Sequence, residues 1–132
     1  MDYVDTNEKK AKCLRPILRG FNGSSLGVEA SAVISSDGFT LAWELDDNVD
    51  PDRYGAMCAS LLALSNRAAQ EIARGELKQV MIEGENGAML LVYAGEDAVL
   101  ALGTKATANM GMVFIEARKT AQKIKEVLSA IA

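Results

Sequence analysis

The chain of 132 residues contains no histidine. Histidine is the commonest general base, the central residue of most catalytic triads and a frequent zinc ligand. No Cys-x-x-Cys pair and no Gly-x-Ser-x-Gly motif takes its place. These absences predict a protein that is not an enzyme, with no catalytic residues, no metal site and no cofactor.

Aromatic residues and cysteines are also few. The chain has one tryptophan, three tyrosines and three phenylalanines, so its core must be built mainly from aliphatic residues, alanine and methionine. Cys13 and Cys58 are far apart and lie in apolar helical patterns, which favours two reduced, buried thiols over a disulfide. The length predicts one domain over residues 1–132.

The charge and the hydrophobic runs limit the classes of partner. A formal net charge of −4 disfavours nucleic acid, because binding to phosphate backbones needs a concentrated basic surface. No stretch approaches the roughly 20 apolar residues of a membrane span. Residues 1–5 are acidic and lack the apolar run of a signal peptide. We therefore expect a cytoplasmic protein that binds neither nucleic acid nor membranes.

Hydrophobic periodicity predicts three helices and five strands. The strand that begins at Val28 alternates with period two, so we expect it to be half-buried. Pro16 should break or kink the first helix, and Asn86-Gly87 predicts a type I′ hairpin turn with positive φ at both residues. The expected helices cover residues 6–19, 51–74 and 109–131, and the expected strands cover residues 28–35, 39–45, 79–84, 88–94 and 98–102.

Three segments could in principle bind a small ion. The three glycines of residues 20–27 suggest a phosphate loop, but no Lys-Ser/Thr pair follows them, which favours a simple connector. Lys105 near a helix start could meet an anion, although a surface lysine is the simpler interpretation. The acids of residues 46–52 lack the glycine and glutamate of an EF-hand loop. Capping of the next helix by Asp50, with Pro51 at its first position, explains these acids better.

The helix over residues 51–74 carries two kinds of surface. One broad apolar stripe should lie on a sheet, and it consists of Tyr54, Met57, Cys58, Leu61, Leu62, Leu64, Ala68, Ala69 and Ile72. The opposite side repeats small or uncharged residues, namely Ala56, Ala59, Ala63, Asn66 and Gln70. Small residues let two helix backbones approach closely, so we favour a helix–helix contact there over plain exposure to solvent.

The order of elements and three local motifs together resemble the roadblock (dynein light-chain) family. The motifs are Ser-Ser-Asp-Gly-Phe at residues 35–39, the alanine-rich central helix, and Ala-Asn-Met-Gly at residues 108–111. The resemblance implies a layered α/β fold: a five-stranded antiparallel sheet with one long helix on one face and the N- and C-terminal helices on the other. It also implies dimerisation through the long helix and the first strand of the three-stranded meander.

The same resemblance implies a noncatalytic regulator or scaffold for a Ras-like small GTPase, and a prokaryotic chain of this kind resembles the partner of a gliding-type GTPase. The expected homodimer interface comprises Ala56, Ala59, Ala63, Gln70, Val80 and Ile82. The expected GTPase-binding residues, on the polar rim of the paired helices, are Arg53, Asn66, Arg67 and Arg74. Two alternatives are a small-ligand sensor domain and a structural dimerisation module without a GTPase partner.

Overall fold

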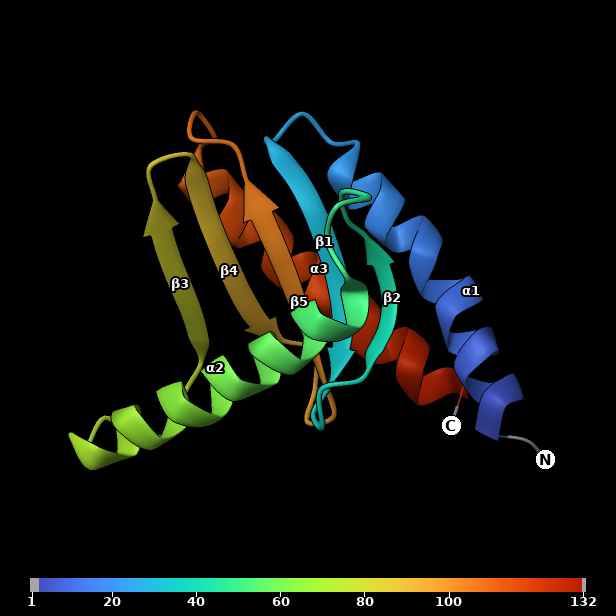
Figure 1. Ribbon diagram of the computed structural model, residues 1–132, viewed down its shortest axis with the longest axis horizontal. Coiled ribbons are helices and arrows are strands. Elements are labelled where there is room, and N and C mark those ends of the chain that lie inside the picture. Colours follow the sequence, from blue (N-terminus) through green and yellow to red (C-terminus); the bar gives the residue numbers. More distant parts are fainter. Residues whose placement is uncertain (1–2, 132) are drawn as a thin grey trace.

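Five strands form one antiparallel sheet in the order β2-β1-β5-β4-β3, and three helices cover it (Figure 1). The computed structural model describes residues 3–131, with side chains from residue 6 onward. The predicted fold class is confirmed. The elements are α1 (Tyr3–Asn22), β1 (Val28–Ser35), β2 (Thr40–Glu44), α2 (Pro51–Glu71), β3 (Gln79–Gly84), β4 (Gly87–Tyr93), β5 (Ala98–Thr104) and α3 (Met110–Ile131).

The sheet separates two hydrophobic cores. Helices α1 and α3 cover one face and α2 crosses the other, as the family resemblance implied. Successive residues of a strand point to opposite faces, and β5 feeds both cores accordingly. Leu100 and Leu102 pack in the core beneath α1 and α3, whereas Val99 and Ala101 pack in the core beneath α2. The nearly continuous apolar runs of β4 and β5 follow from this double coverage.

Strand β1 is buried on both faces, so the prediction of a half-buried strand is wrong. Ala32 and Ile34 face the α2 core, while Val33 packs in the core under α1 and α3. Ser31 is also buried, and its hydroxyl donates a hydrogen bond of 2.6 Å to Oδ1 of Asn22. A small polar residue therefore occupies a position in the strand that alternation alone assigns to solvent.

Helix α1 is continuous through Pro16, so the predicted break in this helix is wrong. Proline removes the N–H that would bond the carbonyl of Lys12. Pro16 and Lys12 both lie on the exposed side of the helix, where water can bind that carbonyl. Cys13 is exposed on the same helix, so the prediction of two buried thiols is correct only for Cys58.

The first turns of α2 are fastened to the sheet. The Asp50 carboxylate accepts the N–H of Asp52 at 3.0 Å, and the Thr40 hydroxyl donates to the Pro51 carbonyl at 2.6 Å. Gly55 lies so close to Thr40 and to the Gly38 carbonyl that a Cβ at position 55 would collide with both. The predicted cap is confirmed, and the N-terminal half of α2 sits tightly on β2 and on the β1–β2 turn.

The predicted end of α2 and the predicted type of the β3–β4 turn both need correction. The helix α2 ends at Glu71 rather than at residue 74, because Ala73 and Gly75 adopt positive φ values of 59° and 83° and turn the chain. The β3–β4 turn is formed by Glu85 and Asn86, and neither residue has a positive φ. The hairpin is therefore present, but its turn is not of type I′.

Candidate functional site

The face of the molecule that carries α2 is incompletely covered. Met57, Leu64 and Ile72 were predicted to face the sheet, yet their side chains are 50%, 68% and 64% exposed. The prediction failed because the apolar stripe is wider than the strip of helix that reaches the sheet, where Gly55, Cys58 and Leu62 are buried. Figure 1 shows the C-terminal part of α2 projecting beyond β3.

Helix α2 presents two distinct flanks on either side of its buried strip. The alanine flank consists of Ala56, Ala59, Ala63 and Gln70, and the methionine flank consists of Met57, Leu64 and Ala68. The β1–β2 turn borders the alanine flank, because a Cβ at Gly38 would lie 3.3 Å from the Ala59 Cβ. Ala56, Ala63 and Gln70 are exposed, and Ala59 is partly buried.

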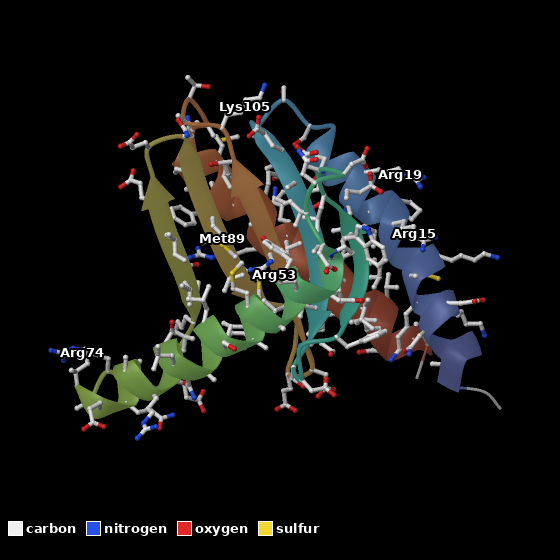
Figure 2. The ribbon with its side chains drawn as sticks, in the orientation of Figure 1. Arg15, Arg19, Arg53, Arg74, Met89 and Lys105 are labelled. Carbon is white, nitrogen blue, oxygen red and sulfur yellow. The ribbon has the colours of Figure 1, made fainter. Side chains whose placement is uncertain are left out.

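The methionine flank faces the opposite way, towards a bare part of the sheet. There β3 and β4 contribute Val80, Ile82 and Met89 on the same sheet face, and Met89 is labelled in Figure 2. Val80 and Met89 are partly buried, and Ile82 is 42% exposed. The flank and these strand residues together make one apolar surface, which we call the open face.

The open face ends at β3, an edge strand with unpaired backbone groups. In β4 the Ala88 N–H donates to the Thr104 hydroxyl at 3.1 Å, and the Ala94 N–H donates to the Ala98 carbonyl at 2.8 Å. Even-numbered residues of β4 thus point their amides at β5, and odd-numbered ones point theirs at β3. Because Ile82 pairs with Met89, the even residues of β3 bond to β4. The peptide groups of Gln79, Met81 and Glu83 therefore point outward.

The predicted partner-binding residues do not form one cluster. Arg53 and Arg67 are exposed on the line between the two flanks, together with Ser60, and this line is called the outer crest. Arg74 lies beyond the end of α2, and Figure 2 shows it far from Arg53. Asn66 turns inward: its Oδ1 accepts the Leu77 N–H at 3.3 Å and ties α2 to the segment entering β3.

The one pair of perturbed ionisable groups under α2 is unsuited to proton transfer. Burial raises the pKa of the Cys58 thiol to about 11 and raises the pKa of the Tyr54 hydroxyl above its ordinary value. Both groups are consequently neutral near pH 7. Among residues 6–131 no group of three or more histidine, cysteine, aspartate or glutamate side chains is arranged to hold a metal ion.

Two carboxylates of the acidic loop before α2 accept hydrogen bonds from backbone N–H groups. Asp46 accepts the Asn48 N–H at 3.4 Å, and Asp50 caps the helix. The Lys105 N–H donates to the Gly27 carbonyl at 2.8 Å, which joins the two loops that the sequence suggested as anion sites. Over the described part of the chain, no helix is long and apolar enough to cross a membrane.

The methionine flank is the part of this candidate site that the sequence did not predict. Met57 and Leu64 are seven residues apart, and Ala68 follows after four, so they lie on one side of the helix. The spacing itself was visible in the sequence. The sequence could not show that the sheet packs against the strip of Gly55, Cys58 and Leu62. Because that strip meets the sheet, the methionine flank stays exposed.

Comparison with known proteins places the fold in a defined group. Three relatives from Methanocaldococcus jannaschii, the uncharacterized proteins MJ1340, MJ0310 and MJ0714, are each 40% identical over 99 residues. The matched segment covers 75% of this chain and 86%, 86% and 83% of the three relatives.

Solved structures share the same arrangement of helices and strands. MglB from Myxococcus xanthus has a TM-score of 0.80 with 14% identity, covering all of this chain and 96% of that one. An MglB structure described as having a tetrameric arrangement has a TM-score of 0.80 with 19% identity and 93% coverage of both chains. A Roadblock/LC7 domain from Streptomyces avermitilis has a TM-score of 0.78 with 19% identity, covering 86% and 95%.

The Roadblock/LC7 domain profile matches residues 23–104, which is more than half of the chain. This segment runs from the loop before β1 to the end of β5, so it contains the complete sheet and α2. The chain therefore belongs to the Roadblock/LC7 domain family, a family of regulatory and scaffold domains that are generally not enzymes.

Proposed function

We propose that this protein is a noncatalytic cytoplasmic scaffold that forms a homodimer through its open face and β3, and that the dimer binds a Ras-like small GTPase. The observation that carries the proposal is the continuity of an exposed apolar surface with an unpaired strand edge. An apolar edge strand invites pairing with another chain, and a second copy of the same surface satisfies both features. The tetrameric arrangement described for one MglB supports self-association in this fold.

The geometry of β3 favours one pairing register. A two-fold axis perpendicular to the sheet places a residue opposite its own copy, and outward peptide groups belong to Gln79, Met81 and Glu83. Centring the axis on Met81 puts Gln79 opposite Glu83 of the second copy, where the amide can donate to the carboxylate. It also puts Val80 opposite Ile82 on the open face. Centring on Ile82 would instead oppose Glu83 to Met81, which offers the carboxylate no donor.

In this arrangement Val80 and Ile82 belong to the dimer interface, as the sequence analysis predicted. The helix contact, however, is made by the methionine flank. The alanine flank, with Ala56, Ala59 and Ala63, lies beside the β1–β2 turn of its own chain. Two copies of α2 would then lie antiparallel over a continuous sheet of two subunits. The outer crests of both helices remain exposed and present Arg53 and Arg67 on one surface.

The two flanks can be tested against each other with neighbouring residues. We expect purified protein at micromolar concentration to scatter light as a dimer of 14.1 kDa chains. Leu64→Glu should weaken the dimer at least about 100-fold, because a carboxylate would be buried against its own copy. Ala63→Glu introduces the same charge on the other flank and should leave the dimer intact. A monomeric wild-type protein, or an unchanged Leu64→Glu dimer, contradicts the proposal.

The register has its own test, which can fail while the dimer stands. In a Cys13→Ser background, Met81→Cys should form an intermolecular disulfide under mild oxidation, because opposed Cα atoms lie about 5.5 Å apart in such a pair. Val80→Cys and Ile82→Cys serve as controls, since their copies are offset along the strand. Faster cross-linking of Ile82→Cys than of Met81→Cys would assign the axis to position 82.

The GTPase contact is tested on the outer crest. Ras-like switch regions are exposed and often acidic, so Arg53→Glu with Arg67→Glu should weaken binding about tenfold or more while light scattering still reports a dimer. The measurement is a titration against Ras-like GTPases of the source organism loaded with GDP or a GTP analogue. Lys119→Glu with Lys123→Glu on α3 is the charge-matched control. Loss of binding only in the α3 variant would move the contact to the opposite side of the sheet.

A further inference from the structure

A recess of about 440 Å³ lies between α1 and the edge strand β2, away from the open face. Its floor and walls are apolar and include Trp43, Leu41 and Ala11, and its rim is polar. Trp43 is 39% exposed, so part of the indole remains accessible from the recess. The residues that line it are Asn7, Glu8, Ala11, Lys12, Arg15, Leu41 and Trp43.

The rim of the recess is positively charged in a protein that is acidic as a whole. The residues that line the recess include two cations, Lys12 and Arg15, and one carboxylate, Glu8. Further along the same helix, Arg19 pairs with Glu44 at 3.6 Å, and Figure 2 shows Arg15 and Arg19 along one side of α1. The chain carries a net charge of −4, so this local excess of cations marks a surface suited to a negatively charged ligand.

The recess is at the opposite edge of the sheet from β3. The strand order β2-β1-β5-β4-β3 separates the two edges by the full width of the sheet. Pairing of two copies through β3 would therefore leave both recesses free, at the two far ends of the dimer. The site does not depend on self-association, and a monomer would carry it equally.

We propose that this recess binds an acidic peptide segment of a partner protein, with one apolar side chain inserted beside Trp43 and carboxylates near Lys12 and Arg15. A hollow of this volume has room for an aliphatic or aromatic side chain, and aromatic anchors in pockets with charged rims are a recurring mode of peptide recognition. A flat lipid surface could touch the rim but could not fill the hollow, which favours a peptide over an anionic membrane.

Trp43 is the only tryptophan, so its fluorescence reports occupancy of the recess directly. The probe is a synthetic peptide of about eight residues, built from aspartate and glutamate with one central leucine. Binding should shift the Trp43 emission to shorter wavelength as the indole leaves water, and the apparent affinity should fall as salt is raised. Replacing the leucine by serine, or the acids by lysine, should weaken binding at least about tenfold.

Variants separate the recess from general charge attraction. Lys12→Glu with Arg15→Glu should abolish the emission shift, whereas Lys119→Glu with Lys123→Glu should preserve it. Trp43→Ala should weaken binding of a dye-labelled copy of the peptide by about tenfold in anisotropy measurements. Circular dichroism and thermal melting establish that each variant is folded.

Three results would overturn the inference. One is an unchanged emission spectrum at millimolar peptide. Another is equal affinity for the serine-substituted peptide, which would reduce the contact to charge alone. The third is sedimentation with phosphatidylserine vesicles that requires Trp43 while the peptide fails to bind, which would identify a lipid surface as the ligand.

Discussion

The two faces of the sheet are built from the same aliphatic residue types, yet only one of them is closed. Under α1 and α3, Leu14, Leu18, Val113 and Ile124 are fully buried. On the face that α2 crosses, Leu64 and Ile82 are 68% and 42% exposed. Two helices cover one face, whereas a single helix crosses the other and leaves the β3 side bare (Figure 1).

The difference teaches where stability and association reside. A closed core contributes to folding of the single chain, because its apolar surface leaves water when the chain folds. Apolar surface that is still exposed after folding contributes only when a partner arrives. The closed face should therefore govern unfolding, and the open face should govern concentration-dependent behaviour.

The largest expected effect comes from truncating the closed face. Leu18→Ala leaves a cavity among buried side chains of α1 and should lower the free energy of unfolding by about 3 kcal/mol. Leu64→Ala removes the same atoms from the open face and should cost little in the monomer, with its effect appearing as a weaker dimer. Urea unfolding at two protein concentrations checks this, and equal losses in both variants would erase the distinction between the faces.

A glycine pair tests how firmly α2 is docked. Gly55→Ala forces a Cβ against Thr40 and the Gly38 carbonyl, so it should cost about 2 kcal/mol or displace the first turns of α2. Gly20→Ala lies in exposed helix with no heavy atom within 4 Å of the new Cβ, and it should raise stability by about 0.5 kcal/mol. Thermal melting compares the two, and a neutral Gly55→Ala would contradict the close packing.

The buried thiol under α2 predicts a loss of stability in alkali. Burial raises the pKa of Cys58 from 9.0 to about 11, so the folded state holds this proton more tightly than the unfolded state. The stabilisation is complete below pH 9 and is lost as pH rises towards 11, by up to about 2 kcal/mol. Melting temperatures between pH 8 and 10.5 should fall less steeply in Cys58→Ala. A parallel decline in both proteins would show that Cys58 does not titrate this way.

The smallest effect distinguishes the two cysteines without changing stability. Cys13 is exposed on α1, and Cys58 is buried on the side of α2 that packs on the sheet. A thiol reagent at pH 8 should modify one cysteine per folded chain and two in denaturant. Cys13→Ser should abolish labelling of the folded protein, and persistent labelling of that variant would mean that α2 opens readily.

Local physics explains how much of the fold was readable from the residues. Strand alternation, the Asp50-Pro51 helix start and the glycine-bounded turns act over a few neighbouring residues, so the element order and the layered sheet could be predicted. The boundaries of β1 and β3 agree with the prediction, and the remaining elements differ mainly at their ends. The turn of the β3–β4 hairpin differs because Gly87 pairs with Gly84 inside the ladder instead of forming the turn.

The candidate site depended on contacts that no local pattern contains. Met57, Leu64 and Cys58 are all apolar residues of one helical stripe, and the way α2 packs on the sheet decides that only Cys58 of the three is buried. From the sequence alone Asn66 was predicted to be a polar residue on the rim of the helix. In the fold its side chain instead accepts a hydrogen bond from the Leu77 N–H. The residues by themselves determined the elements and the apolar surface they carry, because propensity and periodicity are local. Only the tertiary structure decided which part of this apolar surface stays exposed, because burial depends on which distant segments of the chain come together.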